Sequence, residues 1–401
     1  MRFLQADILY PISTPPVKHG ILVMEDDGRV IEIIDPKIHP EEFKRLNSDP
    51  GKLEIFHGIL CPGFVNAHCH LELSHLKGKL DERKRLPAFL KQVSSMRQSS
   101  TEEILEALED ADREMVSNGI VAVGDISNTD HSFQLKSQSR IHYLTFVEMF
   151  DFHPERAEGV FEKGKQLLDQ LNELGLEGTL VPHAPYTVSS KLFRLINEYA
   201  YICGSPVCMH NQETESENEM FLSRKGELFD FLDNAVPFFK EWKATGHPSL
   251  ASTLIQMSSC SKIQLVHNTY STQKDIERAM QFSKMIWWCF CPNANLFIEN
   301  RLPDIPLFLS NVSNITVGTD SYASNWTLSV LDELKSIHRK YPEISLDHLL
   351  KWSTLNGAEF LGMHRELGSF EKNKIPGVNL VSGIDQSSGN LNDTSQVLPL
   401  F

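Results

Sequence analysis

Short apolar runs alternate with amphipathic segments of helical period over most of the chain. Runs rich in β-branched and aromatic residues occupy residues 59–68, 119–127, 141–150, 177–184, 206–210, 262–268, 285–291 and 314–320. Segments such as residues 101–118, with apolar side chains at helical spacing, lie between them. This alternation is typical of parallel strands covered by helices. Eight such strands predict a (β/α)8 TIM barrel of roughly 250 residues or more.

Both ends of the chain carry strand-like sequence outside this alternation. Residues 1–57 contain short apolar strands, with a hairpin turn indicated by the Asp-Asp-Gly sequence at 26–28. Strand-like sequence returns near the C-terminus. We therefore predict an α/β chain in which residues 1–57 and 365–401 form a small β-sandwich and residues 58–364 form the barrel. The segment near 214–250 is predicted to be a helical excursion from that barrel.

The overall composition excludes several classes of protein. The 401 residues are 41% hydrophobic, enough for a large core, and the net charge of −15 offers no basic surface for a phosphate backbone. No run reaches the roughly 20 apolar residues of a membrane span, and the first residues do not resemble a signal peptide. Seven scattered cysteines favour a reducing compartment. We expect a cytoplasmic protein with no nucleic-acid or membrane partner.

Groups that can bind a metal stand at the ends of several predicted strands. His68 and His70 close the first strand, and residues two apart in a strand point to the same side, so both imidazoles can reach one ion. His183, His210 and His267 end three further strands. Each one alone has a second interpretation, because a lone histidine at a strand end is more often a hydrogen-bonded residue at the rim of the core.

Two carboxylates accompany these histidines. Glu213 follows His210 by three residues, a position that suits a proton shuttle beside a metal ligand. It could equally begin a solvated acidic helix, since three more glutamates follow within six residues. Asp320 ends the last predicted strand, where it is either a metal ligand or the N-cap of the next segment.

The joint occurrence of these groups favours a metal site over separate structural roles. The strands of such a barrel end on one face, where barrel enzymes place their reactive groups. Imidazoles with a carboxylate form the mixed nitrogen and oxygen set expected for zinc, iron or manganese, with a position open for water. We therefore predict one divalent metal ion, zinc in the first place, which lowers the pKa of a bound water molecule.

The motifs around these strand ends resemble the amidohydrolase superfamily, in its cytosine-deaminase and chlorohydrolase-like branch. In the family's order they read PGFVNAHCHLELS, LVPHAPYTVS, CMHNQETESENE, LVHN, CFCPNANL and VGTDSYASN. The resemblance covers nearly the whole chain. It implies that four residues are metal ligands, namely His68, His70, His210 and Asp320. It also implies that His267 acts next to the metal-activated water, that Glu213 is the proton shuttle and that His183 contacts the substrate.

Two departures from the family pattern bear on the site. Members with two metal ions carry a carboxylated lysine at the end of strand four, and this chain has TLVPHAP there, which implies a single ion. The seventh-strand motif, usually C-P-x-S-N, reads CPNAN at residues 291–295. We expect Asn295 to organise the loop at that strand end.

The resemblance implies an aminohydrolase, an enzyme that removes the amino group of a nitrogen heterocycle with water. In this scheme an activated water attacks the carbon that bears the amino group, and Asp320 accepts the proton of that water. Glu213 then protonates the neighbouring ring nitrogen while His267 steadies the attacking oxygen, and ammonia leaves.

The sequence after the first strand bears on the substrate. His70 to Ser74 read HLELS, which resembles the H-L-E-F-S motif of aminodeoxyfutalosine deaminases in the alternative menaquinone pathway. Glu72 then contacts the substrate, or alternatively it pairs with a nearby basic residue such as Lys77. The helical excursion carries phenylalanines that either roof the site together with Trp242 or bury the excursion's own core; they are residues 221, 229, 231, 238 and 239.

Other functions stay open at this stage. Within enzymes, the substrate could be adenosine, S-adenosylhomocysteine, guanine or another heterocycle, and the same water could displace chloride or hydrolyse an amide. A catalytically silent barrel that serves as a binding protein is the non-enzyme alternative, although such relatives usually lose ligands that this chain retains. The expected partner is a small heterocyclic substrate, and family habit suggests a homodimer. For a clamp on the substrate we consider Arg85, Arg140 and Arg301, and the sequence selects none of them.

Overall fold

Internal contacts divide the chain into two compact units. This computed structural model describes residues 1–49, 51–236, 239, 241–258, 261–385 and 389–400. The first unit contains residues 1–67, 113–123 and 329–401, and the second contains residues 68–112 and 124–328. All candidate site residues named above lie in the second unit.

The first unit contains two small sheets that share one apolar core. One sheet has the order β5-β4-β1-β6 and the other the order β17-β16-β7-β2-β3. Leu4 and Leu22 of the first sheet and Leu9, Leu60 and Leu380 of the second belong to a single buried cluster. The strands are β1 (Arg2–Gln5), β2 (Ile8–Leu9), β3 (Val17–Lys18), β4 (Ile21–Met24), β5 (Val30–Ile34), β6 (Leu53–Ile55), β7 (Ile59–Cys61), β16 (Asn379–Ser382) and β17 (Gln396–Pro399).

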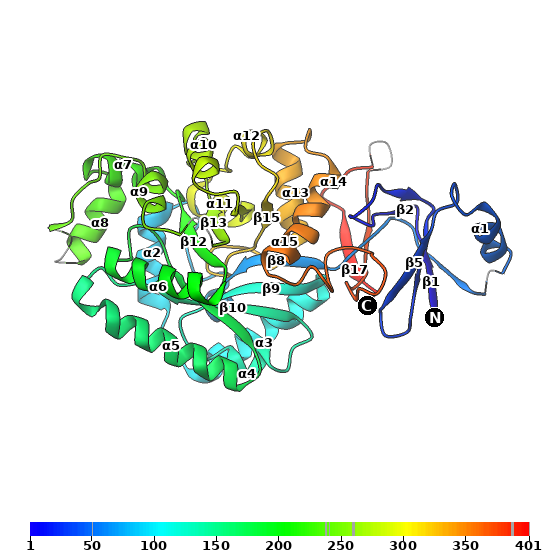
Figure 1. Ribbon diagram of the computed structural model, residues 1–401, viewed down its shortest axis with the longest axis horizontal. Coiled ribbons are helices and arrows are strands. Elements are labelled where there is room, and N and C mark those ends of the chain that lie inside the picture. The colour runs from blue at the N-terminus through cyan, green and yellow to red at the C-terminus, as the bar shows by residue number, and fades with distance from the viewer. Residues whose placement is uncertain (50, 237–238, 240, 259–260, 386–388, 401) are drawn as a thin grey trace. The chain divides into compact units, whose positions relative to one another are not determined.

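The C-terminal tail completes a sheet that begins near the N-terminus. β16 pairs antiparallel with β7, and β7 pairs with β2 (Figure 1). The hairpin predicted at residues 26–28 joins β4 to β5, and Gly28 has a φ of 92°, in the left-handed region that glycine favours. A helix also lies among the β elements of the first unit, α1 (Pro40–Asn47), which the sequence did not predict.

The apolar run 59–68 forms two strands instead of the single strand that we predicted. β7 ends at Cys61 and β8 begins at Phe64, and Pro62 between them has no N–H to donate to a sheet. Gly63 makes a close approach, since a Cβ there would lie 2.3 Å from Cγ1 of Val121. The break therefore separates a strand of the terminal sheet from β8, which leads to the candidate ligands His68 and His70.

Apart from β7, each of the eight predicted apolar runs corresponds to one strand, and β8 and β12 end one residue beyond their runs. These eight strands form two four-stranded sheets with the orders β11-β10-β9-β8 and β12-β13-β14-β15. The pairs β10–β11, β12–β13, β13–β14 and β14–β15 are parallel. The bounds are β8 (Phe64–Cys69), β9 (Ile120–Ser127), β10 (His142–Met149), β11 (Glu177–Pro182), β12 (Val207–Asn211), β13 (Ile263–His267), β14 (Ile286–Phe290) and β15 (Ile315–Val317).

Backbone contacts join the outer strands of these two sheets at their carboxyl ends. Cys69 and Asp320 form a parallel bridge, and the amide of Asp320 donates to the carbonyl of His68 at 3.1 Å. On the other side, the amide of His210 donates to the carbonyl of His183 at 2.9 Å. These backbone bonds bring the residues at the carboxyl ends of β8 and β15, and of β11 and β12, next to each other.

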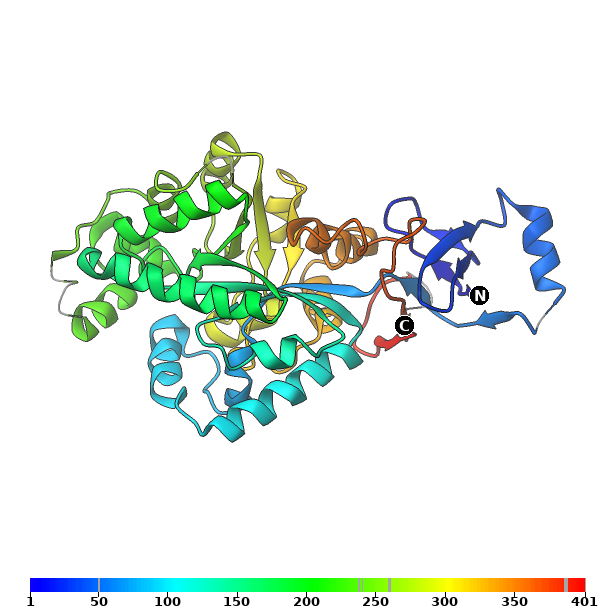
Figure 2. The same cartoon turned by 60° about the horizontal axis from the view of Figure 1, so that its bottom comes forward.

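Helices follow most of these strands. The long helix α5 packs against β10 and β11, and α6 packs against β11 (Figure 2). Helix α3 matches the predicted helix at 101–118. No helix in the described ranges is long and apolar enough to cross a membrane. The bounds are η1 (Leu71–Leu76), α2 (Arg85–Met96), α3 (Thr101–Ser117), α4 (Phe133–Lys136), η2 (Pro154–Arg156), α5 (Ala157–Glu173), α6 (Ser190–Cys203), α10 (Gln273–Phe282), α11 (Pro292–Glu299), α12 (Ile305–Leu309), α13 (Val330–Lys340), α14 (Leu346–Trp352) and α15 (Leu355–Phe360).

The described residues of the predicted excursion include three α-helices: α7 (Glu215–Ser223), α8 (Glu227–Ala235) and α9 (Ser249–Leu254). Phe221, Phe229 and Phe239 are buried in one apolar cluster, against which Trp242 packs. Phe238 lies outside the described residues. This cluster also contains Leu86 of α2 and Phe297 of α11, so the excursion shares its core with neighbouring elements instead of burying a core of its own.

Candidate metal centre and active site

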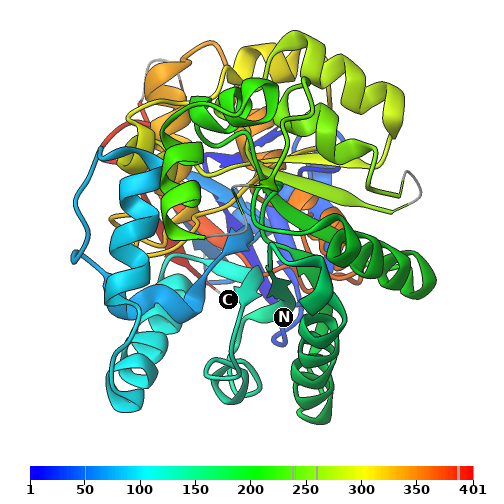
Figure 3. The same ribbon diagram turned by 90° about the vertical axis from the view of Figure 1, so that its left-hand side faces the viewer.

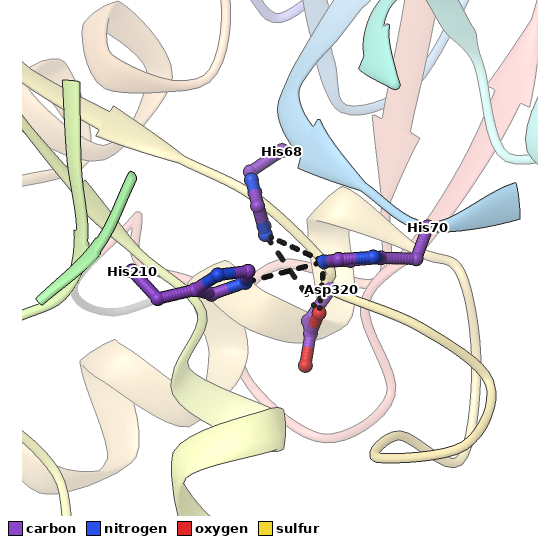
Figure 4. Close-up of side chains that lie close together, drawn as sticks. All are labelled: His68, His70, His210 and Asp320. Carbon is purple, nitrogen blue, oxygen red and sulfur yellow. Dashed lines mark hydrogen bonds and ion pairs between the residues drawn. The ribbon is translucent and has the colours of Figure 1, made fainter. Parts of the chain in front are cut away.

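Three imidazoles and one carboxylate converge at the carboxyl ends of β8, β12 and β15 (Figure 4). Nε2 of His70 lies 3.2 Å from Nε2 of His68, 3.2 Å from Nε2 of His210 and 3.3 Å from Oδ1 of Asp320. One ligand atom from each of these four buried residues lies within 4.8 Å of all the others. The structure thus brings together the four residues that the sequence resemblance implies as ligands.

The spacing of these atoms fits one divalent ion. Nitrogen ligands at 2.0–2.1 Å from zinc, at tetrahedral angles, lie about 3.3 Å apart. The observed nitrogen–nitrogen distances of 3.2 Å are close to this value. Burial also holds the pKa of His68 and His210 well below the usual range, so that both imidazoles are neutral, the form that binds metal.

Hydrogen bonds on the far side of the rings orient the ligand nitrogens. Nδ1 of His210 donates to the carbonyl oxygen of His183 at 2.9 Å, which leaves the lone pair of Nε2 directed at the cluster. Nδ1 of His68 lies 3.5 Å from Sγ of Cys208. On the carboxylate, Oγ of Ser324 donates to Oδ2 of Asp320, leaving Oδ1 on the side of the histidines.

The backbone around the cluster is strained in several places. Asp320 has a φ of 57°, and Gln212, His267 and Asn268 have φ values of 45°, 73° and 56°. Residues other than glycine rarely adopt this left-handed backbone conformation, which costs about 1–3 kcal/mol for each residue. Residues in this conformation concentrate at functional sites. The unusual conformations here all lie at the carboxyl ends of strands that carry candidate site residues.

Glu213 and His267 lie next to each other beside the cluster. Oε1 of Glu213 is 3.7 Å from Nε2 of His267. Burial, and then the carboxylates of Asp320, Glu299 and Glu217, raise the pKa of Glu213 well above its usual value. Nδ1 of His267 is 2.8 Å from Oδ1 of Asn295, and because that amide oxygen only accepts, the ring nitrogen donates. Nε2 of His267 is therefore an acceptor that faces Glu213.

A buried carboxylate fixes the loop that carries Glu213. Oε2 of Glu217 accepts from the amide of Glu213 at 3.2 Å, and Oε1 accepts from the amide of Gln212 at 3.0 Å. Oε1 also accepts from the hydroxyl of Ser249. Burial raises the pKa of Glu217 to about 7. Helix α7 is thereby connected to the site at its first turn.

His183 presents one ring nitrogen to the same region. Its Nδ1 lies 2.8 Å from Oγ1 of Thr187, whose hydroxyl donates to the carbonyl of Ala184 at 3.1 Å. Because the hydroxyl proton of Thr187 is used in this bond, its oxygen accepts a hydrogen bond from Nδ1 of His183. Nε2 of the neutral ring is then an acceptor. Burial is the main cause that lowers the pKa of His183 to about 3. The ring is neutral at physiological pH.

Glu72 is fully engaged by neighbouring donors. Its carboxylate accepts from the guanidinium of Arg97, from the amides of Asn128 and Thr129 at 3.0 and 3.1 Å, and from the Thr129 hydroxyl. It pairs with Arg97, whereas Lys77 donates to the hydroxyl of Tyr322. Among the described residues that line the cavity below, Arg97 and Asn128 are present and Glu72 is not. Glu72 therefore reaches the cavity only through its partners.

A cavity of about 300 Å³ opens onto the cluster, at the lower end of the range for small-molecule sites. Its polar part contains His70, His183, His210, Glu213 and His267, together with Asp320. Its apolar part comes mainly from helices α2 and α8, which lie side by side (Figure 3), and from Phe150, Phe152 and Tyr186. Phe231 of the excursion contributes to this wall. The space suits a flat ring with an apolar or mixed substituent.

A family model decides what this arrangement belongs to. Residues 59–398 match the model described as "Amidohydrolase family". The chain belongs to the amidohydrolase family. Membership makes it a metal-dependent hydrolase that acts on carbon–nitrogen bonds. The cluster of three histidines and one aspartate is a group that could hold the ion, and Glu148, His183 and His210 form a second such group that shares His210.

Curated relatives and solved structures extend this comparison over most of the chain. An adenosine deaminase of Helicobacter pylori is 26% identical, over 88% of this chain and 86% of its own. An aminodeoxyfutalosine deaminase of Deinococcus radiodurans is 27% identical, over 90% of this chain and 86% of its own. The crystal structure of Helicobacter pylori aminofutalosine deaminase with methylthio-coformycin has a TM-score of 0.79 at 20% identity, covering 97% of this chain and 94% of that one. At this identity the likeness shows a shared fold.

Several residues at the site were missed by sequence reasoning. Arg97, Asn128 and Glu148 line the cavity, yet none stands in a motif with histidines. Asp125 accepts from the amide of Leu71, directly after His70, and forms a fully buried ion pair with Lys136 at 2.6 Å. A charged residue such as Asp125 inside an apolar strand was the available signal, because buried charges need partners. The arginines considered for a clamp lie elsewhere: Arg85 pairs with Glu227 and Arg301 stacks on Tyr270.

Proposed function

We propose that this protein is a hydrolytic deaminase that removes the amino group from the purine ring of an adenosine-like nucleoside. One divalent ion, zinc in the first place, is held by His68, His70, His210 and Asp320. The observation that carries the proposal is the position of Glu213: a buried carboxyl of raised pKa that lines the cavity beside the ligand cluster without belonging to it. The names of the curated relatives support the choice of substrate class.

When bound, the ion would activate a water molecule for attack on the carbon that bears the amino group. Asp320 accepts a proton from that water. Nε2 of His267, an acceptor because Nδ1 donates to Asn295, orients the water by hydrogen bonding. Glu213 donates its proton to the ring nitrogen next to the attacked carbon, which makes that carbon a better electrophile. The proton held by Asp320 then passes to the amino group, which leaves as ammonia when the carbon–nitrogen bond breaks. The remaining hydroxyl proton returns to Glu213 as the carbonyl forms. His183, with Nε2 free as an acceptor, binds a donor group of the substrate ring.

Finer assignments belong to the same proposal. Aminodeoxyfutalosine, and with it menaquinone biosynthesis, is the first candidate substrate, supported by the HLELS motif and by one relative's name. The eight strands are taken as one closed (β/α)8 barrel, with residues 58–364 as its extent and residues 1–57 and 365–401 as the β-sandwich. Glu72 serves substrate binding through Arg97 rather than directly. We also retain the predictions of a homodimer and of a cytoplasmic location.

Ammonia release tests the proposal directly. Purified, metal-loaded protein is assayed side by side with aminodeoxyfutalosine, adenosine, S-adenosylhomocysteine, guanine and cytosine. Turnover of the nucleosides, with little or none of the free bases, is the expected result. Preference for guanine or cytosine would favour the alternative of a base deaminase, and silence on all five would remove deamination of these compounds. Absence of any bound ion at neutral pH would instead revive the non-enzyme alternative.

The variant Glu213→Gln tests the role of the key residue. A glutamine keeps the size of the side chain but cannot give up a proton, so kcat is expected to fall by about 100-fold or more while metal content is retained. Glu215→Gln is the matched control, because Glu215 is exposed two residues further along the same segment. Turnover of the Glu213 variant within a few fold of the unaltered protein would contradict the proposed role.

A further inference from the structure

Arg97 is the one arginine of the described chain that lines the cavity, and its orientation is fixed by neighbours. It follows helix α2, and its side chain is 35% exposed. Nη2 donates to the carboxylate of Glu72 and, at 2.8 Å, to Oδ1 of Asn128. Glu72 is itself held by Thr129 and by the amide of Asn128. The guanidinium is therefore held in one orientation before any ligand binds.

Several donors of this arginine have no acceptor among the described residues. Both protons of Nη2 are used by Glu72 and Asn128, whereas no residue within the described ranges accepts from Nε or Nη1. A guanidinium carries five N–H donors, so three are left for a ligand or for water. Because Arg97 lines the cavity and keeps donors that no described residue uses, it can bind an acceptor oxygen of a ligand there.

An acceptor lies next to these donors on the same wall. Asn128 accepts from Arg97 through Oδ1 and donates through Nδ2 to Oε2 of Glu148 at 3.1 Å. The other oxygen of Glu148, Oε1, lies 3.7 Å from Nδ1 of His210, too far for a hydrogen bond. Glu148 lines the cavity and is buried. Asn128 thus holds a donor group and an acceptor group side by side.

We propose that Arg97, Asn128 and Glu148 form a recognition site for a vicinal diol, such as the 2′- and 3′-hydroxyls of a ribose. A hydroxyl both donates and accepts, so two adjacent hydroxyls can accept from Arg97 and donate to Glu148 at the same time. A carboxylate or phosphate would meet the two carboxylates of Glu72 and Glu148, and an apolar group would leave Nε and Nη1 of Arg97 and Oε1 of Glu148 without a hydrogen bond. The inference rests on the proposed function, because the diol belongs to a nucleoside, and it makes these residues determinants of sugar specificity.

Paired nucleosides test the site. The metal-loaded protein and its variants Arg97→Met and Glu148→Gln are assayed for kcat/KM with adenosine and with 2′,3′-dideoxyadenosine, which lacks both hydroxyls. The unaltered protein is expected to favour adenosine by roughly 10- to 100-fold, the size of a hydrogen bond to a charged group. In each variant this ratio falls to within about threefold of one. Arg339→Met is the control: Arg339 is exposed and pairs with Asp393 in the first unit, so its ratio is unchanged.

The diol site is refuted if the unaltered protein has nearly equal kcat/KM for adenosine and 2′,3′-dideoxyadenosine, or if both variants keep the preference for adenosine. Neither result would contradict the proposed deamination. If Arg97→Met does not fold, judged by its thermal midpoint, Arg97→Lys keeps the charge near Glu72 but has fewer donors and must lower the ratio as well. If the unaltered protein releases no ammonia from any nucleoside, the proposed deamination fails. Calorimetric binding of inosine against 2′,3′-dideoxyinosine then decides the site: a preference that depends on Arg97 supports it, and equal binding overturns it.

Discussion

Gly318 lies where the chain after β15 comes closest to β8, and an alanine there tests how the metal site is held. A Cβ at this position would lie 2.7 Å from the carbonyl oxygen of His68, 2.8 Å from its Cβ and 3.0 Å from its nitrogen. Two of these three atoms are backbone and cannot rotate away as a long side chain can. The φ of Gly318 is outside the left-handed region, so space alone excludes the methyl group.

The size of the effect follows from these contacts. Carbon atoms in contact are normally about 3.5–4.0 Å apart, so the two strand ends must separate by about 0.7 Å. Overpacking of this kind costs about 1–3 kcal/mol. His68 is the residue that is pushed and Asp320 is two residues from the substitution, so the shift reaches two of the four proposed ligands. Metal sites tolerate deviations of only about 0.2 Å in the distance between metal and ligand. We therefore expect the affinity for zinc to fall roughly 10- to 100-fold.

The assay is a zinc competition titration against a chelator, combined with thermal unfolding of the metal-free protein. Gly159→Ala is the matched control, because Gly159 is exposed in α5 and no atom lies within 4 Å of the point that an added methyl group would occupy. That variant should bind zinc normally and be as stable as the unaltered protein, or up to about 1 kcal/mol more so. Unchanged zinc affinity and unfolding midpoint in Gly318→Ala would refute the idea that this close approach sets the ligand geometry.

Three further predictions concern the site. Thr187→Val removes the acceptor of His183 Nδ1, so kcat/KM should fall roughly tenfold, with metal content unchanged by mass spectrometry; normal kinetics would contradict the assigned ring orientation. Removal of the metal by a chelator should lower the thermal midpoint, since an ion at 100 times its Kd stabilises the fold by about 2.7 kcal/mol, and an unchanged midpoint would argue against a site formed only in the folded state. The pKa of Glu217 is about 7 in the folded chain against 4.5 when unfolded, so its contribution to stability is fully present below pH 4.5 and is lost as pH rises through 7. The stability deficit of Glu217→Gln should therefore be smaller at pH 8 than at pH 5, by roughly 3 kcal/mol, and a gap independent of pH would contradict the raised pKa.

Much of the strand framework could be predicted from the sequence because buried strands leave a local pattern. All eight apolar runs contain a strand, and the histidine or aspartate at a run's end marks where the strand reaches the site. His68, His210 and Asp320 meet because parallel strands bring their carboxyl ends to one edge, a consequence of topology that the alternation of elements already implies. The sequence also shows Pro62 inside the first apolar run, but it does not show that the two halves of that run join different sheets.

Other features depend on contacts between distant segments and leave no local pattern. Arg97 meets Glu72 across 25 residues and Asn128 across 31. Nothing in the helical period of α2 distinguishes this arginine from Arg85 at the other end of the helix, which makes an exposed ion pair. Likewise β17 consists of only four residues and gains its partner from β16, so its identity as a strand comes from pairing rather than composition.

Buried carboxylates and strained backbone concentrate at the ends of the strands that carry the site. Asp125, Glu148, Glu213 and Glu217 are all buried there, and burial raises the pKa of each. A chain selected only for stability would place apolar side chains at these positions, because burying a charge is costly unless it is paired. The positions at which buried side chains are charged instead of apolar are therefore the positions where we expect the chemistry. A substitution that makes such a position apolar, such as Glu213→Leu, should make the protein more stable and less active.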